Sequence, residues 1–464
     1  MKKIACALCT SLLLNASELL TTNSSLSLES AISILKSQNL EIKTASYDID
    51  SAKEDQKTVD GLHWGKLDFI QDYAHSNDAG NVFGFKLTSR EATFGDFGAR
   101  EFMTATGMNG GIPPESAYTT PPEDLNYPDA RSFFQSKLKY EIPLFTGFKI
   151  NSYSEIMKAM TQMKNLDKNK IVKEKVYQLR KSFYDMALLR DSKEHLTKIL
   201  DNIKTLEEMT KTMIEVGYAK KVDLLEVQAK KGDVERVISQ IDSNQKLLYH
   251  YISFLLNQDV KMILTPCPDV EMPILSNENI LQNNIDIQRA TTGLKIRDNM
   301  LKVSQSAYYP MVGAFGEIST ADDTFLGDAS DHKAYTVGAR VSWNLYNGGI
   351  DEANIEKAKI QQLKTTTQLE LAKQGILLKI RKIRTEIATL NGDIESLNKE
   401  FKLANAIYEN YEGRYKEKLV SMSDVIIKQS QQIQKILELQ QVKNSRNKRI
   451  FALEKLANGE NNEK

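Results

Sequence analysis

An internal duplication constrains this chain more than any other feature. The tetrapeptide Leu144–Gly147, with the sequence Leu-Phe-Thr-Gly, returns 201 residues later as Leu345–Gly348, with the sequence Leu-Tyr-Asn-Gly. Asp223 reappears as Asp424 at the same offset. Long amphipathic segments without proline separate each glycine from its aspartate. One structural unit is therefore written twice.

A second offset locates an insertion in the first copy. Asn39–Ile42 matches Asn284–Ile287 at an offset of 245 residues. The difference between the two offsets, 245 − 201 = 44, places about 44 extra residues between Gly65 and Gly147.

The first residues predict a secretory signal peptide. Lys2 and Lys3 form a basic end, Ile4–Leu14 is a short apolar run, and small residues follow at Ala16. This order is typical of an exported protein. The alternative, a buried first helix, fits less well with the charged start and the polar residues that follow.

Composition excludes several classes of protein. Hydrophobic residues make up 41% and charged residues 26%, and the formal net charge is zero. These values are ordinary for a folded protein and give no basic surface for nucleic acid. No run approaches the ~18 apolar residues of a transmembrane helix. Cys6 and Cys9 leave with the signal peptide, and Cys267, without Cys or His partners at metal spacing, is expected to be structural.

Four segments have the alternating pattern of strands: Lys66–Ser76, Phe134–Leu144, Tyr309–Ser319 and Tyr335–Leu345. Each has about 10 residues, the length that crosses a bilayer when tilted. Two hairpins give four strands, which cannot close a barrel, and an open edge cannot lie in lipid. We therefore expect the missing strands to come from other copies of the chain.

Heptad repeats predict long supercoiled helices. A helix over Phe148–Val216 would be roughly 100 Å long at 1.5 Å per residue. Apolar residues hold a 3.5-residue period in 224–255 and again in 380–415, which favours left-handed coiling around partner helices. A further helix is expected from Leu26 to about Asp60. An ordinary soluble coiled coil would explain these helices, but not the paired strands or the signal peptide.

Each helical pair is expected to turn near its repeated aspartate. Gly217 supplies a helix stop in the first copy. Asp223–Glu226 and Ser421–Asp424 both have capping-box spacing. For Asp223 and Asp424, helix capping and a functional role are equally open.

The residues between strands and helices complete the division of the chain. Residues 77–131 are rich in Gly, Pro, Asp and Thr and are interpreted as a long functional or mobile loop. The Pro-rich stretch from Asn257 to Asn277 is expected to form a small mixed belt. The predicted parts are 1–16, signal peptide; 17–65, first-repeat helix; 66–145, first β-hairpin with the insert 77–131; 146–256, long helical hairpin of repeat one; 257–280, equatorial linker; 281–308, second-repeat helix; 309–347, second β-hairpin; 348–456, long helical hairpin of repeat two; and 457–464, polar tail.

The sequence has no motif of an enzyme. There is no Gly-rich loop ending in Lys-Ser/Thr and no His-Glu-x-x-His, and the five histidines are scattered. We therefore expect no catalytic residue, no cofactor and no resident metal. The acidic loop with Asp322, Asp323, Asp328, Asp331 and His332 lacks the glutamate that completes an EF-hand, so a solvated surface loop is favoured over a cation site.

The repeated strand hairpin and long helical hairpin, with a secretory signal, resemble the TolC-like outer membrane efflux proteins. The resemblance covers nearly the whole mature chain. Its most specific pieces are Pro143–Gly147, Trp343–Gly349, Val216–Asp223, Leu419–Val425 and Ala307–Pro310.

The insert also has a counterpart in that family. Val82–Leu87 and Leu125–Asp129 resemble an insertion seen in some members. We expect it at the extracellular mouth, where it would plug or shield the opening.

The resemblance implies a fold class and partners. The expected fold is a mixed α/β membrane protein, mainly α, with an internal two-fold repeat. As a homotrimer it would form a twelve-stranded outer-membrane β-barrel, continued by a long periplasmic α-helical coiled-coil barrel. The implied partners are itself, a periplasmic adaptor (membrane fusion) protein, an inner-membrane RND or ABC transporter and outer-membrane lipid, with no nucleic acid. The implied location is the outer membrane of a Gram-negative bacterium.

The resemblance also implies site residues. The periplasmic tip, or gate, would include Asp223, Tyr415, Asp424, Gly217, Ser421 and Lys418, and the strand–helix junctions Gly147, Gly348 and Pro310. Lys418 stands where the family usually has glycine. Val420 replaces a basic residue of the closing network, and Ile427 replaces a second lumenal acid, so the network and any cation-binding ring would be weaker here.

These observations favour a passive export duct, the outer-membrane part of a tripartite efflux or type I secretion system, which is not an enzyme. The alternative is a secreted structural coiled coil of the adhesin type. A periplasmic adaptor fits less well, because adaptors have one helical hairpin and this chain has two.

Overall fold

The computed structural model describes residues 25–107, 112–267, 269–327 and 331–457. The predicted signal peptide, and Asp328 of the acidic loop, lie outside the described residues.

The chain divides into two compact units. The sheet unit comprises Ser51–Gln162 and Thr292–Thr366. The helical unit comprises Met1–Asp50, Met163–Thr291 and Thr367–Lys464. Each unit therefore draws on both repeats.

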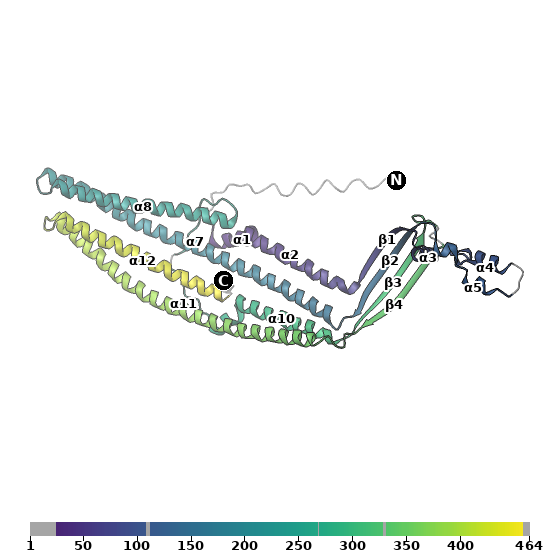
Figure 1. The fold of residues 1–464 in the computed structure, drawn as a ribbon. Helices are drawn as coiled ribbons and strands as arrows, with labels where there is room; N and C mark the ends of the chain where they lie inside the picture. The colour runs from purple at the N-terminus through teal and green to yellow at the C-terminus, as the bar shows by residue number, and fades with distance from the viewer. Residues whose placement is uncertain (1–24, 108–111, 268, 328–330, 458–464) are drawn as a thin grey trace, which may run out of the picture. The chain divides into compact units, whose positions relative to one another are not determined.

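The sheet unit is built on one antiparallel meander in the order β1-β2-β3-β4 (Figure 1). Its strands are β1 (Lys66–Ser76), β2 (Arg131–Phe145), β3 (Met311–Asp322) and β4 (Lys333–Ser342). Besides the two predicted hairpins, β2 pairs with β3. The hairpins of the two repeats therefore form a single sheet.

The strand boundaries differ from the prediction at both ends of the sheet. At the end away from the helices, β2 begins at Arg131, β3 ends at Asp322 and β4 begins at Lys333. β1 has the predicted bounds, but β3 begins at Met311 and β4 ends at Ser342, so the extension of the last strand to Leu345 is wrong. Met311 pairs with Ser342, and Pro310 precedes it. Proline has no N–H to donate, which ends the ladder at this position.

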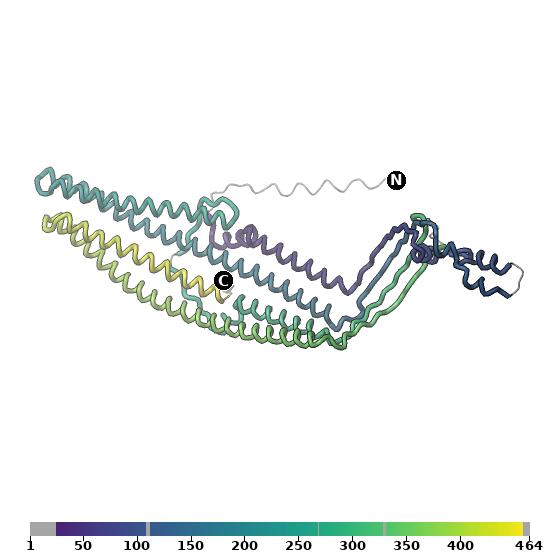
Figure 2. The backbone as a smooth tube through the Cα atoms, in the orientation of Figure 1, coloured from purple at the N-terminus to yellow at the C-terminus, as the bar shows by residue number. Residues whose placement is uncertain are grey.

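Four long helices form the two helical hairpins: α7 (Lys149–Glu215), α8 (Lys221–Leu256), α11 (Ile350–Lys416) and α12 (Met422–Leu456). α7 and α11 each have 67 residues, and α8 and α12 have 36 and 35. The helix predicted over Phe148–Val216 is confirmed to within one residue at each end. In Figure 2 the α7–α8 turn and the α11–α12 turn lie at the same end of the helical unit.

The predicted heptads form the core near these turns. The buried cluster contains Leu196, Ile199, Ile203 and Leu206 of α7, Val227, Val234 and Ile241 of α8, Tyr408 and Tyr415 of α11, and Met422, Val425, Ile433 and Ile436 of α12. Helices of both repeats therefore share one core, as the 3.5-residue period predicts.

The single helix predicted from Leu26 to Asp60 is wrong. The chain forms α1 (Leu28–Gln38) and α2 (Leu40–Gly61), which are separated by Asn39. The Asn39 carboxamide oxygen accepts hydrogen bonds from the backbone N–H groups of Glu41 and Ile42, at 3.0 and 3.1 Å. Asn39 is therefore the N-cap of α2, and a cap residue has extended rather than helical backbone.

The same asparagine also binds the end of the returning helix. Its Nδ2 donates to the carbonyl of Leu255 at 2.8 Å, and Asn39 is 4% exposed. A buried carbonyl in the last turn of α8 is thus satisfied by a side chain from the start of α2. We call this pair of roles the asparagine clasp.

The second repeat reproduces the clasp. Asn284 separates α9 (Asn277–Asn283) from α10 (Ile285–Gln305). Its Nδ2 donates to the Leu456 carbonyl at 3.0 Å, and its Oδ1 accepts from the N–H groups of the second and third residues after it, at 3.0 and 3.2 Å. The duplication therefore extends to single hydrogen bonds.

The insert is folded, so the interpretation of residues 77–131 as a loop is wrong for much of its length. It contains α3 (Ala79–Thr88), α4 (Ala99–Thr106), α5 (Glu115–Thr119) and α6 (Glu123–Asn126). The Asp78 carboxylate caps α3 by accepting from the Asn81 N–H at 3.0 Å. Asp and Pro residues, counted as loop formers in the sequence, here start short helices.

The predicted equatorial linker contacts the N-terminal part of the described chain. In the predicted equatorial linker, Ile263 forms a parallel bridge with Leu26. Among the described helices, none is both long enough and apolar enough to cross a membrane.

Candidate functional site: a two-faced sheet and two helix turns

One face of the sheet is apolar and exposed. The register places Leu67 opposite Tyr140, and Ile318 opposite both Leu138 and Tyr335. Large side chains on it are unusually exposed, at 81% for Tyr335 and 77% for Val337. The apolar members of this face are Leu67, Phe69, Tyr73, Phe134, Leu138, Tyr140, Ile142, Val312, Ala314, Ile318, Tyr335, Val337, Ala339 and Val341. A continuous apolar face of this size requires a covering partner or lipid.

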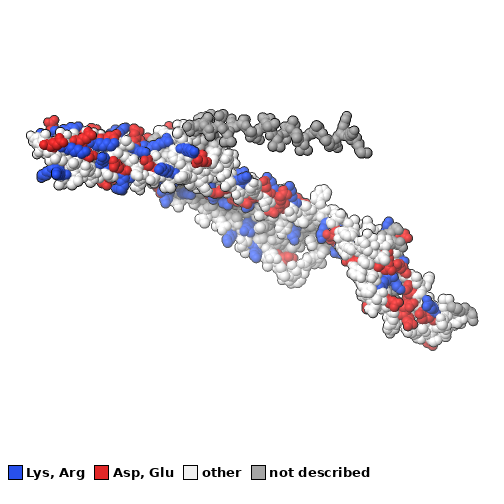
Figure 3. All heavy atoms as spheres, turned by 90° about the horizontal axis from the view of Figure 1, so that it is seen from above, with Lys and Arg blue, Asp and Glu red and all other residues white. Residues whose placement is uncertain are grey.

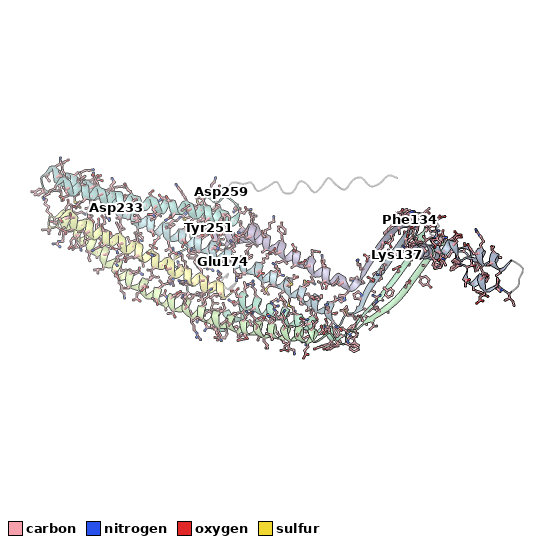
Figure 4. The ribbon with its side chains drawn as sticks, viewed as in Figure 1. Phe134, Lys137, Glu174, Asp233, Tyr251 and Asp259 are labelled. Carbon is pink, nitrogen blue, oxygen red and sulfur yellow. The ribbon has the colours of Figure 1, made fainter. Side chains whose placement is uncertain are left out.

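The opposite face carries most of the charges; Asp322 and Lys333, at the outer end of the strands, share the face of Phe134. Because successive side chains alternate across a strand, the residues between those of the apolar face point the other way. Lys137 and Asp72 form an ion pair at 3.3 Å on this polar face. Figure 4 labels Lys137 and Phe134, which belong to opposite faces of β2. The charged members are Lys66, Asp68, Asp72, Arg131, Lys137, Lys139, Glu141, Glu317 and Arg340.

Aromatic side chains surround the ends of the strands that lead into the helices. Trp64 is 78% exposed and Tyr346 is 85% exposed. The Trp343 indole N–H donates to the Tyr308 carbonyl at 3.3 Å. Aromatic residues concentrate in this way where a spanning strand leaves the hydrocarbon layer.

The strand–helix junctions use positive φ angles in both repeats. Gly147 has φ +61°, and a Cβ there would lie 2.7 Å from the Ser306 carbonyl oxygen. Only glycine fits both the angle and the space. Gly348 has φ +72°, and a Cβ there would meet no atom within 4 Å, so only the angle favours glycine. Of the predicted junction residues, Pro310 lies directly before β3.

The turn of the first helical hairpin has the predicted helix stop. Gly217 has φ +78°. The Tyr218 N–H donates to the Met213 carbonyl at 2.7 Å, and the Gly217 N–H to the Ile214 carbonyl at 3.1 Å. These two bonds form the Schellman motif that ends a helix with a left-handed residue.

The second turn makes the same bend with a lysine. Lys418 has φ +64°, although it is not glycine. The Leu419 N–H donates to the Arg414 carbonyl at 2.8 Å, and the Lys418 N–H to the Tyr415 carbonyl at 2.9 Å. The departure at Lys418 that the sequence showed is therefore absorbed without a change of turn geometry.

Both repeated aspartates cap helices from the third position. The Asp424 carboxylate accepts from the Ser421 N–H at 3.1 Å, and the Asp424 N–H donates to the Ser421 hydroxyl at 3.2 Å, which confirms that capping box. The Ser421 hydroxyl and N–H lower the pKa of Asp424. In the first repeat the Asp223 carboxylate accepts from the Lys220 N–H at 2.7 Å. The box expected over Asp223–Glu226 is therefore wrong, because Asp223 occupies the third position, as Asp424 does.

Side chains connect the two turns to each other. The Lys418 ammonium lies 3.3 Å from the centre of the Tyr218 ring, a cation–π contact between the repeats. The Ser423 hydroxyl donates to the Glu226 carboxylate at 2.5 Å, which joins α12 to α8. Sequence reasoning missed Tyr218, Ser423 and Glu226, because their partners lie in the other repeat.

Tyr415 and Asp223, expected in one closing network, make different hydrogen bonds, although, besides burial, the charge of Asp223 contributes to raising the pKa of Tyr415. The Tyr415 hydroxyl lies 3.4 Å from the Thr210 hydroxyl, which joins α11 to α7. Burial raises the pKa of Tyr415. The structure thus brings all six predicted tip residues to the two turns, with Tyr415 buried and Asp424 exposed.

Possible metal ligands occur among the described residues. In this part of the chain, no group of three or more His, Cys, Asp or Glu side chains is placed to hold a metal ion.

Comparison with known proteins gives a family match for part of the chain and a fold for nearly all of it. Residues 277–459, which span most of the second repeat, match the family of outer membrane efflux proteins. No curated protein sequence matches the chain. Solved structures match it over nearly its full length.

Three of these structures illustrate the likeness. The CusC channel has a TM-score of 0.76 and 14% identity, over 95% of each chain. The outer membrane protein VceC of Vibrio cholerae has a TM-score of 0.74 and 14% identity, over 93% of this chain and 96% of its own. The CmeC outer membrane channel of Campylobacter jejuni has a TM-score of 0.72 and 13% identity, over 94% of this chain and 89% of its own.

At these identities the solved structures establish the TolC-like fold, and the family match is independent of them. Residues 277–459 thus match the outer membrane efflux protein family, and nearly the whole chain has the fold of TolC-like outer membrane channels.

Proposed function

We propose that three copies of this chain form the export duct of a tripartite efflux or type I secretion system, passing substrates from an inner-membrane pump to the exterior. The observation that carries this proposal is the four-stranded sheet, with one apolar face, one charged face and two unpaired edges. Such a sheet suits a barrel whose apolar face meets lipid and whose charged face meets water.

The edges argue for more than one copy. Within the described chain β1 pairs only with β2, and β4 only with β3. An unpaired backbone N–H or carbonyl in hydrocarbon costs several kcal/mol, so both edges must find partners. Closure by β1 of a neighbouring copy satisfies β4, and three copies supply twelve strands. TolC-like channels are homotrimers, which supports this number.

The long helices also leave apolar side chains for neighbours. On α8, Leu225, Leu247 and Phe254 are 63%, 64% and 68% exposed. Exposed apolar residues along a helix mark a surface that another helix covers. Figure 3 shows basic and acidic side chains interspersed along the helices on the face in view, without one dominant sign. Neighbouring copies would thus pack through apolar stripes between mixed charges.

The energy for export would come from a partner in the inner membrane, and the gate would lie at the two helix turns. We infer that a periplasmic adaptor engages the two helix turns and that an RND or ABC transporter of the inner membrane drives export. The proposed gate consists of Gly217, Asp223, Tyr415, Lys418, Ser421 and Asp424. Support comes from the contacts that tie the two turns together, above all Lys418 on Tyr218. Three exposed Asp424 carboxylates around the axis would favour cations.

The test combines native mass with a pair of neighbouring substitutions on β4. Detergent-extracted protein should have a native mass near three chains. Val337→Lys places a charge on the apolar face and should cost about 2–4 kcal/mol at mid-membrane, with loss of the trimer. Thr336→Lys changes the adjacent residue on the polar face and should leave the trimer intact. A monomer or dimer that stays soluble without detergent would overturn the proposal and favour a secreted coiled coil.

A further inference from the structure

The insert between β1 and β2 packs against the polar face of the sheet. The Phe85 ring of α3 stacks on the Phe133 ring of β2, with centroids 4.3 Å apart and planes inclined by 9°. Phe133 pairs with Ala74 and alternates with Phe134, so it lies on the polar face. Phe133 is 7% exposed. The first helix of the insert, α3, therefore covers the charged side of the sheet, not the apolar side.

Further contacts hold the insert on that face. Arg131, which also belongs to the polar face, forms an ion pair with Glu91. Ala321, on the polar face of β3, is 2% exposed, as is Val82 of α3. The Arg90 guanidinium donates to the carbonyl of Lys333, the first residue of β4, at 2.7 Å. The insert thus reaches from the end of β1 to the start of β4 across the outer end of the sheet.

The insert has internal order as well. The Asp96 carboxylate pairs with Lys86 and accepts from the Thr93 N–H at 2.7 Å. The rings of Phe83 and Phe97 meet edge to face at 5.2 Å. In Figure 1, α3 lies at the ends of the strands, and α4 and α5 lie beyond it. A segment with these contacts holds a defined position.

In a closed barrel, the polar face of the sheet lines the bore. Whatever rests on that face at the outer ends of the strands lies inside the mouth. We propose that the described parts of the insert, residues 79–107 and 112–128, fold into the extracellular mouth of the duct and narrow it from within. This inference rests on the proposed barrel. It concerns a segment that only the first repeat has, and that is not needed to close the barrel.

Simple geometry shows how much of the mouth three inserts would occupy. Twelve strands about 4.8 Å apart and tilted by about 40° enclose a cylinder roughly 24 Å across. Three helices of about 10 Å diameter need a circle of roughly 22 Å. One α3 helix from each copy would therefore fill most of the bore, so the mouth of the duct would be narrowed until the inserts move.

The test measures how fast a reagent from outside the cell reaches the bore. Cys267→Ser removes the free cysteine found among the described residues. Ser319→Cys then places a thiol on the polar face of β3, two residues from Ala321. Intact cells receive a maleimide on a polyethylene glycol of about 5 kDa, which is too large to pass between packed helices. Replacing residues 79–128 by a short Gly-Ser turn should speed labelling of Ser319→Cys by roughly tenfold or more, because no local opening is then needed.

Two controls separate the possible failures. Val337→Cys, on the apolar face, should resist labelling with and without the insert. If Val337→Cys labels rapidly, the barrel is wrong and this inference falls with it. If Val337→Cys is protected but Ser319→Cys labels equally fast in both chains, the barrel stands and the placement of the insert is overturned.

A milder variant serves if the shortened chain fails to assemble. Phe85→Ala with Arg131→Ala removes the two side-chain contacts with the polar face, and should also speed labelling of Ser319→Cys. Tyr127→Ala, at an insert residue that is 83% exposed, is the matched control and should have no effect. If both variants form trimers and Ser319→Cys is labelled at the same rate in each, the inference is contradicted.

Discussion

Replacing Gly217 by alanine should introduce backbone strain at one helix turn, and replacing Lys418 by glycine should remove it from the other. The positions are equivalent by the 201-residue offset, and both have positive φ, at +78° and +64°. Alanine at Gly217 would meet no atom within 4 Å, so its cost is confined to the backbone angle. At Lys418 that cost is already present in the native chain.

The magnitudes follow from these angles. A residue with a side chain in the left-handed region costs about 1 kcal/mol relative to glycine. Gly217→Ala should therefore destabilise its turn by about 1 kcal/mol. Lys418→Gly relieves a similar amount but loses the cation–π contact with Tyr218, which contributes about 0.5–1 kcal/mol at an exposed site. Lys418→Ala loses the same contact and keeps the strain, so the two lysine variants should differ by about 1 kcal/mol.

Hydrogen exchange of the trimer in detergent, followed by mass spectrometry, reports these differences locally. The amides that close the turns belong to Tyr218 and Leu419. An energy of about 1 kcal/mol changes local opening, and therefore exchange, by roughly fivefold. Tyr218 should exchange faster in Gly217→Ala, and Leu419 should exchange more slowly in Lys418→Gly than in Lys418→Ala.

Two results would refute this reasoning. Unchanged exchange of Tyr218 in Gly217→Ala would mean that the turn opens without breaking its Schellman bonds. Equal exchange of Leu419 in Lys418→Gly and Lys418→Ala would mean that the positive φ of Lys418 stores no strain.

Two further predictions concern the helical unit. Asn39→Asp keeps the cap acceptor of α2 but loses the donor to the Leu255 carbonyl, so it should lower stability by about 1–3 kcal/mol; a thermal midpoint equal to that of the native chain would contradict the clasp. Glu207 accepts hydrogen bonds from Lys211, Lys231 and Gln228, which lower its pKa from 4.5 to about 2. Because the folded pKa lies below the unfolded value, its contribution is complete above pH 4.5 and is lost as the pH falls towards 2. In Glu207→Gln, the helix signal in circular dichroism should fall less steeply between pH 4.5 and 2 than in the native protein. Equal dependence of the helix signal on pH in both proteins would contradict this role.

The periodic elements could be predicted from the sequence because their signals are local. Alternation over ten residues specifies a strand, and a 3.5-residue period specifies a coiled helix. The break at Asn39 could not be predicted in this way, because the apolar spacing continues through it. Asn39 caps α2 through local hydrogen bonds, and its side chain also bonds to Leu255, 216 residues away in the chain.

The capping of α8 shows how the duplication itself carries information. Asp223 fits both the first and the third position of a capping box, so local spacing did not decide between them. The 201-residue offset aligns Ser421 with Lys220, which would have placed Asp223 in the third position. The contacts between turns, such as Lys418 on Tyr218, have no counterpart at either offset. They depend on the packing of one repeat against the other.

The two repeats agree where they build the scaffold and differ where their helices pack near the turns. In the first repeat, Gln228 donates to Glu207 at 3.3 Å. The equivalent residues of the second repeat are Gln429 and Tyr408, which are 0% and 1% exposed and have side-chain polar atoms without a hydrogen-bond partner among the described residues. An unsatisfied buried polar group costs about 1–3 kcal/mol. At this level the α11–α12 hairpin therefore lacks the polar contact that joins α7 to α8, although Gln432 donates to Asn405 at 2.6 Å and Lys435 pairs with Glu400 at 2.7 Å one turn or two further along. The second repeat thus replaces the Gln228–Glu207 contact by burial of Tyr408 and Gln429.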